Sequence, residues 1–236
     1  MHTDAVPADN AFAWDRLSEW YQSNARIPTD VVTYGGGLPT ETELRLCGDV
    51  RGKRVLELGC GGAQCSIAFA KQGARAIGVD ASGVQLAYGR KLAEAEEVKV
   101  ELRQCDMADL GFITSGSIDL AFSAQSFAFV DDLNRVFRQV HRVLRPDATL
   151  VFSIKHPFST IVNADRIIRP YWSDAPNDWE EQGIAFTTYQ HTIADLFASL
   201  HRANFRVDVI LEPEPANARH AQIPPGLVMR ARKLGV

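Results

Sequence analysis

The chain has 236 residues, a formal net charge of −4, 46% hydrophobic residues and 23% charged residues. This balance predicts a globular protein of one large domain and excludes a chain that is disordered throughout. The slight acidity argues against nucleic acid or an anionic membrane as a partner. No apolar run approaches the roughly 18 residues of a membrane span. We expect no secretory leader and a cytoplasmic location.

The four cysteines form no C-x-x-C pair, and no His-x-x-x-His accompanies them. Zinc sites need such spacings, so none is expected, and no other metal triad is visible. Reduced thiols in a cytoplasmic protein are the expected state. The cysteines are Cys47, Cys60, Cys65 and Cys105.

Short apolar runs alternate with longer amphipathic ones along most of the chain. In chain order the predicted elements are a strand (54–59), a helix (64–73), a strand (75–80), a helix (82–97), strands (99–106 and 117–125), a helix (131–146), a strand (148–157), a helix (192–205) and strands (206–214 and 226–233). This alternation predicts an α/β fold with a Rossmann-like sheet of seven mostly parallel strands and helices on both faces. The last two strands are joined by a short link without a helical pattern, so the last strand should be antiparallel.

Two regions lie outside this alternation, and both carry aromatic side chains. We therefore divide the chain into an N-terminal helical cap (1–48), a Rossmann-like core (49–157), an insertion that forms a substrate lid (158–190) and the C-terminal part of the core (191–236). The alternative is that these aromatic residues simply pack on the edges of the sheet. The lid interpretation is favoured because sites in such folds lie beyond the carboxyl ends of the strands.

A glycine-rich turn, Gly59-Cys60-Gly61-Gly62-Ala63, follows the first predicted strand. Glycines there let a ligand approach the backbone, and the helix that follows offers free amides. A dinucleotide-binding loop would carry its third glycine at Gln64, so the match to that class is poor. Glu57 precedes the turn, where it would repel a pyrophosphate but suit an ammonium or a sulfonium.

Acids also end the next two strands. Asp80 follows the glycines by about 20 residues, where a carboxylate can accept from both hydroxyls of a ribose. Asp106 ends the third strand and can accept from an exocyclic amine, while Met107 can pack on a purine ring.

These motifs resemble those of class I S-adenosylmethionine-dependent methyltransferases, and most closely the small-molecule enzymes of the type 11 group. The stretches that carry the resemblance are VLELGCGGAQCS, AIGVDAS, CDMADL, SIDLAFSAQSFAFV and VLRPDATLVFS. The one departure is Ala63, where the family has a third glycine.

The resemblance implies S-adenosyl-L-methionine as cofactor and S-adenosyl-L-homocysteine as product. The residues that it implies for cofactor binding are Glu57, Gly59, Cys60, Gly61, Asp80, Ala81, Ser82, Asp106, Met107, Ser123 and Ala124, with Tyr21 from the cap. The acceptor is expected to be a small molecule, and the chain a monomer or homodimer.

His156, at the end of the fifth strand, is the candidate general base for an oxygen acceptor, because imidazole titrates in the required range. The alternative is a histidine that holds the following loop by hydrogen bonds. Either Tyr21 or Tyr34 is expected to touch cofactor or substrate. Tyr171, Trp172 and Trp179 are candidates to line the acceptor pocket.

Three other functions stay open on the sequence. The same fold can methylate nitrogen or carbon. A non-catalytic module could bind the cofactor alone. A nicotinamide-dependent oxidoreductase is disfavoured by Glu57 and Gln64.

Overall fold

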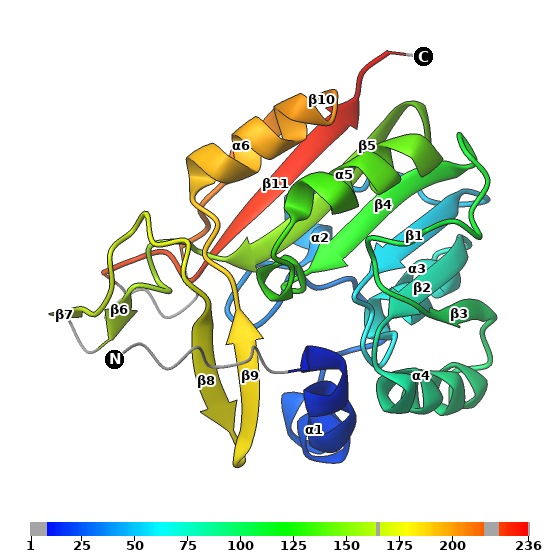
Figure 1. The fold of residues 1–236 in the computed structure, drawn as a ribbon. Helices are drawn as coiled ribbons and strands as arrows, with labels where there is room; N and C mark the ends of the chain where they lie inside the picture. The colour runs from blue at the N-terminus through cyan, green and yellow to red at the C-terminus, as the bar shows by residue number, and fades with distance from the viewer. Residues whose placement is uncertain (1–8, 164–165, 215–221, 236) are drawn as a thin grey trace.

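The computed structural model describes residues 9–163, 166–214 and 222–235. The start of the predicted cap, two residues of the insertion and most of the link between the last two strands lie outside these residues. The main sheet has seven strands in the order β10-β11-β5-β4-β1-β2-β3 (Figure 1). Its strands are β1 (Arg54–Leu58), β2 (Arg75–Asp80), β3 (Val100–Gln104), β4 (Ile118–Ala124), β5 (Leu144–Lys155), β10 (Phe205–Leu211) and β11 (Gly226–Lys233).

The predicted topology is confirmed. Neighbouring strands from β3 to β5 run parallel, and β11 runs antiparallel to both of its neighbours, β5 and β10. The helices of the core are α3 (Gln64–Lys71), α4 (Gly83–Ala95), α5 (Leu133–Val143) and α6 (Ile193–Arg202), with a short 3-10 helix η1 (Phe127–Phe129) after β4.

The helix predicted over 131–146 ends three residues early. Leu144 is already extended, with φ −67° and ψ 143°, and it begins β5. The residue before a proline is disfavoured in the helical conformation, so Arg145 cannot continue the helix toward Pro146. The fifth strand consequently starts four residues earlier than the sequence predicted.

Two apolar clusters cover the two faces of the sheet. On one face, α5 and α6 pack against the sheet through residues such as Phe137 and Leu200, and the ring of Phe137 lies 6.1 Å from that of Phe152 of β5. On the other face, α3 and the segment 32–50 pack around Phe122 of β4. Because successive strand residues point to opposite faces, Leu56 belongs to the first face, and Val55 and Glu57 to the second.

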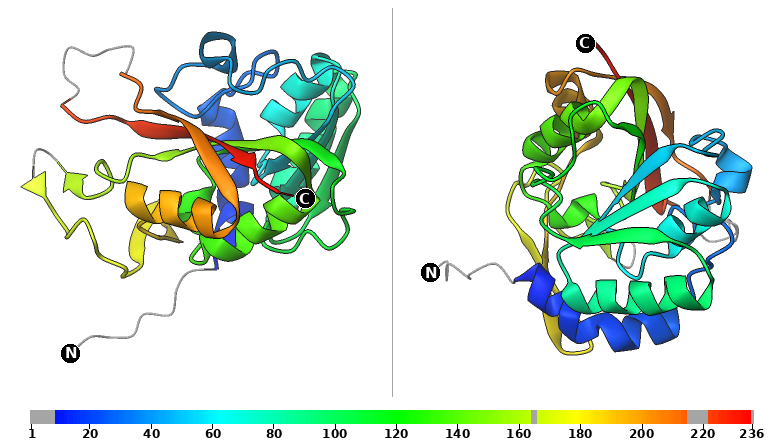
Figure 2. Two further views of the ribbon diagram at one scale, coloured as in Figure 1. Left: turned by 90° about the horizontal axis from the view of Figure 1, so that it is seen from above. Right: turned by 90° about the vertical axis from the view of Figure 1, so that its right-hand side faces the viewer.

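The N-terminal segment and the insertion contact each other beyond the carboxyl ends of the central strands (Figure 1). The N-terminal segment holds α1 (Asn10–Ala25) and the short α2 (Glu41–Leu44). The insertion holds β6 (Val162–Asn163) with β7 (Arg166–Ile167), and the hairpin β8 (Asn177–Glu181) with β9 (Ile184–Thr188). Helix α1 contacts both α4 and β9, and Figure 2 shows it running along the edge of the core.

Two hydrogen bonds of the Asn10 side chain join α1 to the β8–β9 hairpin. The Asn10 side chain donates to the carbonyl oxygen of Thr187 at 2.8 Å and accepts from its amide at 3.0 Å. Apolar residues of α1, such as Leu17, pack on Phe186 of β9. The helix and the hairpin therefore form one wall, although they are more than 150 residues apart in the sequence.

Candidate active site

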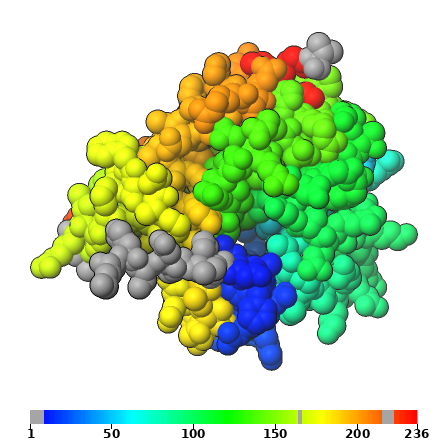
Figure 3. Space-filling model, in the orientation of Figure 1, coloured from blue at the N-terminus to red at the C-terminus, as the bar shows by residue number. Residues whose placement is uncertain are grey.

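A large cavity, of about 1030 Å³, lies at the carboxyl ends of the central strands. On the face shown in Figure 3, α1 (blue) lies between the β8–β9 hairpin (yellow) and α4 (teal). The core side of the cavity is lined by Gly59, Gly61, Val79, Asp80, Ala81, Ser82, Gln85, Cys105, Asp106, Met107, Ala124, Gln125 and Ser126. The cap and insertion supply Asn10, Trp14, Tyr21, Thr160, Asn177, Asp178, Trp179, Thr188, Tyr189 and Gln190, among others, and Lys155 comes from the end of β5.

The turn after β1 has the backbone that only glycine adopts without strain. Gly59 and Gly61 have φ values of 65° and 51°. A Cβ at Gly59 would lie 2.3 Å from Cβ of Ser126, so a side chain there has no room. Ala63 also has a left-handed φ, of 62°, where the resembling family has glycine. The turn is thus shaped as predicted, with one residue under modest strain.

Asp80 ties this turn to the end of β2. Its carboxylate accepts from the Gly61 amide at 2.7 Å and from the Ser82 amide at 2.8 Å. Burial raises the pKa of Asp80, although these two hydrogen bonds act in the opposite direction. A carboxylate of this kind, partly desolvated beside a cavity, gains from further donors such as hydroxyl groups.

Asp15 of α1 holds the N-terminus of α4, and no sequence pattern singles this residue out. Asp15 accepts from the Ser82 hydroxyl at 2.6 Å and from the Val84 amide at 3.0 Å. Ser82 itself caps α4 by accepting from the Gln85 amide at 3.1 Å. This arrangement fixes α1 next to the Asp80 side of the cavity.

Asp106 and Met107 line the cavity from the turn after β3. One oxygen of Asp106 accepts from the Ala108 amide at 2.8 Å, which orients the carboxylate. Asp106 is exposed, whereas Met107 is half-buried and packs against the core. An adenine placed between them would find an acceptor for its amine and an apolar surface for its ring.

Glu57 does not lie among the described residues that line the cavity. It points to the α3 face of the sheet, is 4% exposed, and accepts from the Ser66 hydroxyl at 2.5 Å. Burial raises the pKa of Glu57 to about 8. Its contact with a cationic group therefore stays a prediction, and it would act from beneath the glycine turn.

Cys60 and Ser123 also stay outside the set of lining residues that the structure describes. Cys60 is buried under the turn, and its sulfur lies 2.8 Å from where a Cβ of Gly78 would be. The hydroxyl of Ser123 donates to the carbonyl oxygen of Leu58 at 3.1 Å. Both side chains hold the β1 turn from behind. Ala81, Ala124 and Tyr21 do line the cavity.

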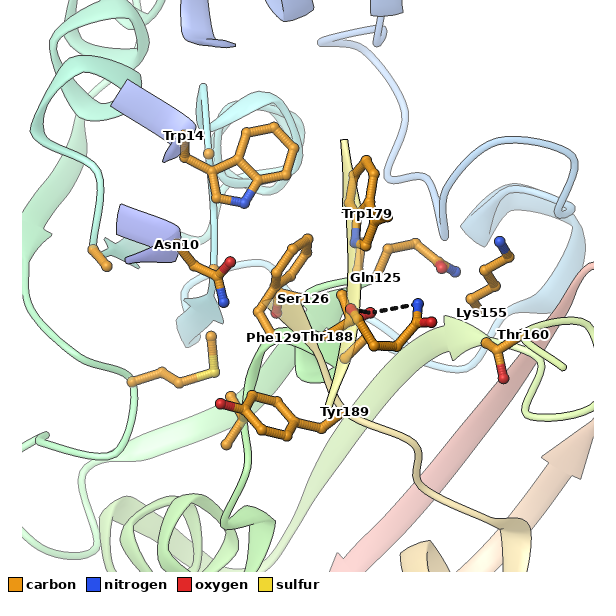
Figure 4. Close-up of a pocket in the computed structure, with 18 of the residues that line it drawn as sticks. Asn10, Trp14, Gln125, Ser126, Phe129, Lys155, Thr160, Trp179, Thr188 and Tyr189 are labelled. Carbon is orange, nitrogen blue, oxygen red and sulfur yellow. Dashed lines mark hydrogen bonds between the residues drawn. The ribbon is translucent and has the colours of Figure 1, made fainter. Parts of the chain in front are cut away.

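Aromatic rings form the wall on the cap side (Figure 4). Trp14 lies 5.6 Å from Phe129 and 5.2 Å from the buried Phe186, measured between ring centroids. Trp179 stacks on Phe186 at 4.8 Å. Such a wall suits a planar or apolar molecule.

Other aromatic candidates lie elsewhere. Tyr34 is fully buried against Phe122, at 5.5 Å between centroids, and its hydroxyl donates to Glu41. Trp172 is 83% exposed. The Tyr171 hydroxyl accepts from the Ile193 amide at 3.4 Å. Tyr34, Tyr171 and Trp172 are not among the described residues that line the cavity. Of the three aromatic residues predicted in the insertion, Trp179 therefore lines it and the other two do not.

His156 is 5% exposed and does not belong to the described lining of the cavity. Its Nδ1 accepts from the Phe158 amide at 3.1 Å, so the proton is on Nε2, which donates to Glu212 at 2.9 Å. With both ring nitrogens engaged, no lone pair is free for a substrate hydroxyl. The geometry fits the alternative interpretation, a histidine that holds the loop after β5.

Several lining residues had no signal in the sequence. Gln125 follows β4 with a φ of 60°, and its amide group donates to the carbonyl oxygen of Tyr34 at 3.0 Å. Asn10 and Gln85 come from α1 and α4. Polar residues at such positions look like ordinary surface residues until the fold brings them together.

A seven-stranded sheet with an antiparallel last strand, a glycine turn after β1 and acids after β2 and β3 define the class I methyltransferase fold. Residues 56–152 match the family described as "Methyltransferase domain", of type 11. These residues therefore match the family that the sequence predicted, the S-adenosylmethionine-dependent methyltransferases of class I.

Individual relatives agree with this match. The chain is 30% identical over 161 residues to the ubiquinone biosynthesis O-methyltransferase of Bordetella avium, a match that covers 66% of this chain and 63% of that protein. It is 26% identical to an S-adenosylmethionine-dependent methyltransferase structure from Mesorhizobium loti, with a TM-score of 0.71 over 81% of this chain and 96% of that one. A putative methyltransferase from Listeria monocytogenes shares the fold, at 21% identity and a TM-score of 0.71 over 83% of this chain and 98% of that one.

The match to the Bordetella protein spans less than two thirds of that protein's length. In the part of the chain that the structure describes, no helix has the length and apolar character needed to cross a membrane.

Proposed function

We propose that the protein transfers the methyl group of S-adenosylmethionine to an oxygen atom of a small-molecule acceptor. The observation that carries this proposal is one continuous cavity with two unlike ends. Acids and the glycine turn form one end, and the aromatic rings of α1, η1 and β8 form the other. At about 1030 Å³, the cavity reaches the top of the range of roughly 300–1,000 Å³ typical of small-molecule sites, so it can hold a donor and an acceptor together.

Methyl transfer from a sulfonium needs mainly positioning, because the leaving group is already good. In this arrangement the Asp80 carboxylate would accept from the ribose hydroxyls, and Asp106 would accept from the adenine amine. The acceptor would then pack against Trp14, Phe129 and Trp179. The two wall elements, α1 and the hairpin, are linked through Asn10 and would close over the acceptor.

An oxygen acceptor is supported by the name of the Bordetella relative, which is an O-methyltransferase. A hydroxyl acceptor also has to lose a proton. The cavity offers the carboxylate of Asp178, which accepts from the Thr187 hydroxyl at 2.6 Å. Desolvation raises the pKa of Tyr189, and the nearby Asp131 and Asp178 raise it further. This phenol therefore stays protonated and can donate a hydrogen bond. We assign the proton acceptor to Asp178 rather than His156.

A turnover assay tests the proposal. The wild-type protein is incubated with methyl-tritiated S-adenosylmethionine and a panel of planar phenols, with the matching anilines as nitrogen acceptors. The proposal expects label in a phenol product, stoichiometric S-adenosylhomocysteine, and loss of turnover in Asp178→Asn with cofactor affinity kept. Label in the anilines alone would contradict oxygen as the acceptor. Cofactor binding without turnover on any acceptor would favour a non-catalytic binding module.

A further inference from the structure

Two cationic side chains, those of Lys155 and Arg169, line the cavity. Neither forms an ion pair with a carboxylate of the described residues. The guanidinium of Arg169 donates to the Ser173 hydroxyl at 3.3 Å and to the carbonyl oxygen of Ala175 at 2.7 Å. These uncharged acceptors orient the guanidinium but do not neutralise it.

The order of the strands separates Lys155 from the acids that would hold the cofactor. Asp80 ends β2 and Asp106 follows β3, on one side of β1, whereas Lys155 ends β5, on the other side of β1. In Figure 4, Trp179 lies between Trp14 and Lys155. Lys155 therefore lies at the end of the cavity where the acceptor would bind.

Backbone contacts bring Arg169 to the same end. The turn 156–161 follows Lys155 directly, and its Ile161 carbonyl oxygen accepts from the Ile168 amide at 2.8 Å. Ile168 immediately precedes Arg169 and also lines the cavity. The two cations therefore come from neighbouring segments of the chain at one end of the cavity.

An acceptor that fills this end displaces the water around both cations. A neutral acceptor would leave them desolvated and without a counter-charge, which is costly, whereas an anion would form charge-assisted hydrogen bonds with them. Outside the cofactor end, Asp178 is the acid that lines the cavity among the described residues. Two cations and one carboxylate leave a single positive charge, which one carboxylate of a ligand neutralises.

We propose that the acceptor is an aromatic hydroxy acid whose carboxylate binds Lys155 and Arg169. The inference rests on the proposed function, since it names the class of acceptor for the same reaction. Arginine offers a planar pair of donors to a carboxylate, and lysine adds a compact charge. The hydroxyl oxygen gains the methyl group from the sulfonium, which becomes a neutral thioether, and loses its proton to Asp178. The carboxylate is unchanged.

The test compares acids with their neutral carboxamides. The probes are the meta and para isomers of hydroxybenzoate and hydroxycinnamate, the carboxamide of each, and the two matching hydroxyphenyl phosphates. Each is titrated calorimetrically into protein saturated with S-adenosylhomocysteine, using the wild type, Lys155→Met and Arg169→Gln. Lys99→Met is the matched control, because Lys99 is exposed just before β3 and does not line the cavity. Affinity for S-adenosylhomocysteine and circular dichroism melting are measured first for every variant.

We expect at least one acid to bind the wild type about tenfold more tightly than its carboxamide, the usual effect of a hydrogen bond between charged groups. Lys155→Met and Arg169→Gln should each weaken that acid about tenfold and leave the carboxamide within about twofold. Lys155→Glu should weaken the acid further, because it sets two carboxylates against each other. Turnover of the same acid should give its methyl ether, with the effect of both variants in KM rather than in kcat.

Equal affinity for acids and carboxamides would overturn the inference, as would acid binding that stays unchanged in Lys155→Met and Arg169→Gln. A methyl ester as the product would overturn it too, because the carboxylate would then lie at the sulfonium. Tighter binding of the phosphates than of every acid would contradict a carboxylate as the anion. Lys155 is exposed at the end of its strand, so Lys155→Met keeps the test decisive if Arg169→Gln unfolds. If the wild type does not bind S-adenosylhomocysteine, it is the proposed function that fails.

Discussion

Replacing Asp80 by alanine tests the ribose subsite. The two carboxylate oxygens of Asp80 already accept from Gly61 and Ser82, and their remaining lone pairs face the cavity. Two ribose hydroxyls that donate to a charged acceptor contribute about 1.5–3 kcal/mol each. Taking the lower figure, Asp80→Ala should cost about 3 kcal/mol, which is a roughly hundredfold increase in Kd.

The assay is calorimetric titration with S-adenosylhomocysteine on folded variants. Asp49→Ala is the control, because Asp49 also accepts from a nearby backbone amide, that of Arg51, but it is exposed and does not line the cavity. Unfolding in urea separates a loss of affinity from a loss of stability. A Kd increase below about fivefold in Asp80→Ala would refute the reasoning, because the cofactor would not use this carboxylate.

Three further predictions concern the turn and the loop after β5. Burial raises the pKa of Glu57 to about 8, so the folded state keeps this proton to a higher pH than the unfolded state does. The free energy of unfolding should therefore fall as the pH rises from about 5 to 8, by at most about 1.4 kcal/mol per pH unit. Glu57→Gln should remove that slope in urea unfolding series, and parallel curves would contradict the buried carboxyl. Ala63→Gly relieves the strain of a left-handed φ but removes a buried methyl group. The free energy of unfolding should therefore stay within about 1 kcal/mol of wild type, and the Kd for S-adenosylhomocysteine within about threefold. A large gain in affinity would mean that Ala63 distorts the turn. His156→Ala removes two hydrogen bonds of the imidazole ring, so it should lower the free energy of unfolding by about 1–3 kcal/mol. The acidic limb of the pH–rate profile should keep its midpoint, and a shift or loss of that limb would show that His156 is the base.

The main sheet was predictable because its signals are local. Apolar strands closed by glycine or an acid, such as Arg54–Leu58 and Arg75–Asp80, specify both the strand and the edge at which it ends. The antiparallel direction of the last strand followed from a link that is short and has no helical pattern in its sequence. The end of α5 was missed by three residues because the effect of Pro146 reaches back to the residues before it.

The site was predictable only where a side chain follows directly from a strand end. Asp80 and Asp106 lie in the cavity for that reason. Glu57 is one residue inside β1, and strand alternation directs it to the α3 face instead. The hydrogen bonds that link Gln64 to Gln22 and Gln22 to Gln85 join three helices over as many as 63 residues of sequence, and no spacing rule anticipates them.

The cap was foreseen as a segment but not as a structure. Aromatic residues outside the core indicated a lid, yet they could not tell Trp179, which lines the cavity, from Trp172, which is exposed. The pairing of β8 with β9 sets Trp179 opposite Phe186, whereas Trp172 lies in a turn before β8. The link from Asn10 to Thr187 depends on the same pairing.

Calorimetric titration of the wild-type protein with S-adenosylmethionine tests most directly whether the cavity binds this cofactor. We expect one binding site per chain with micromolar affinity, together with a higher melting temperature in the presence of S-adenosylmethionine or S-adenosylhomocysteine. Absence of binding heat and of any melting shift with both compounds would contradict the assignment of the cavity to this cofactor.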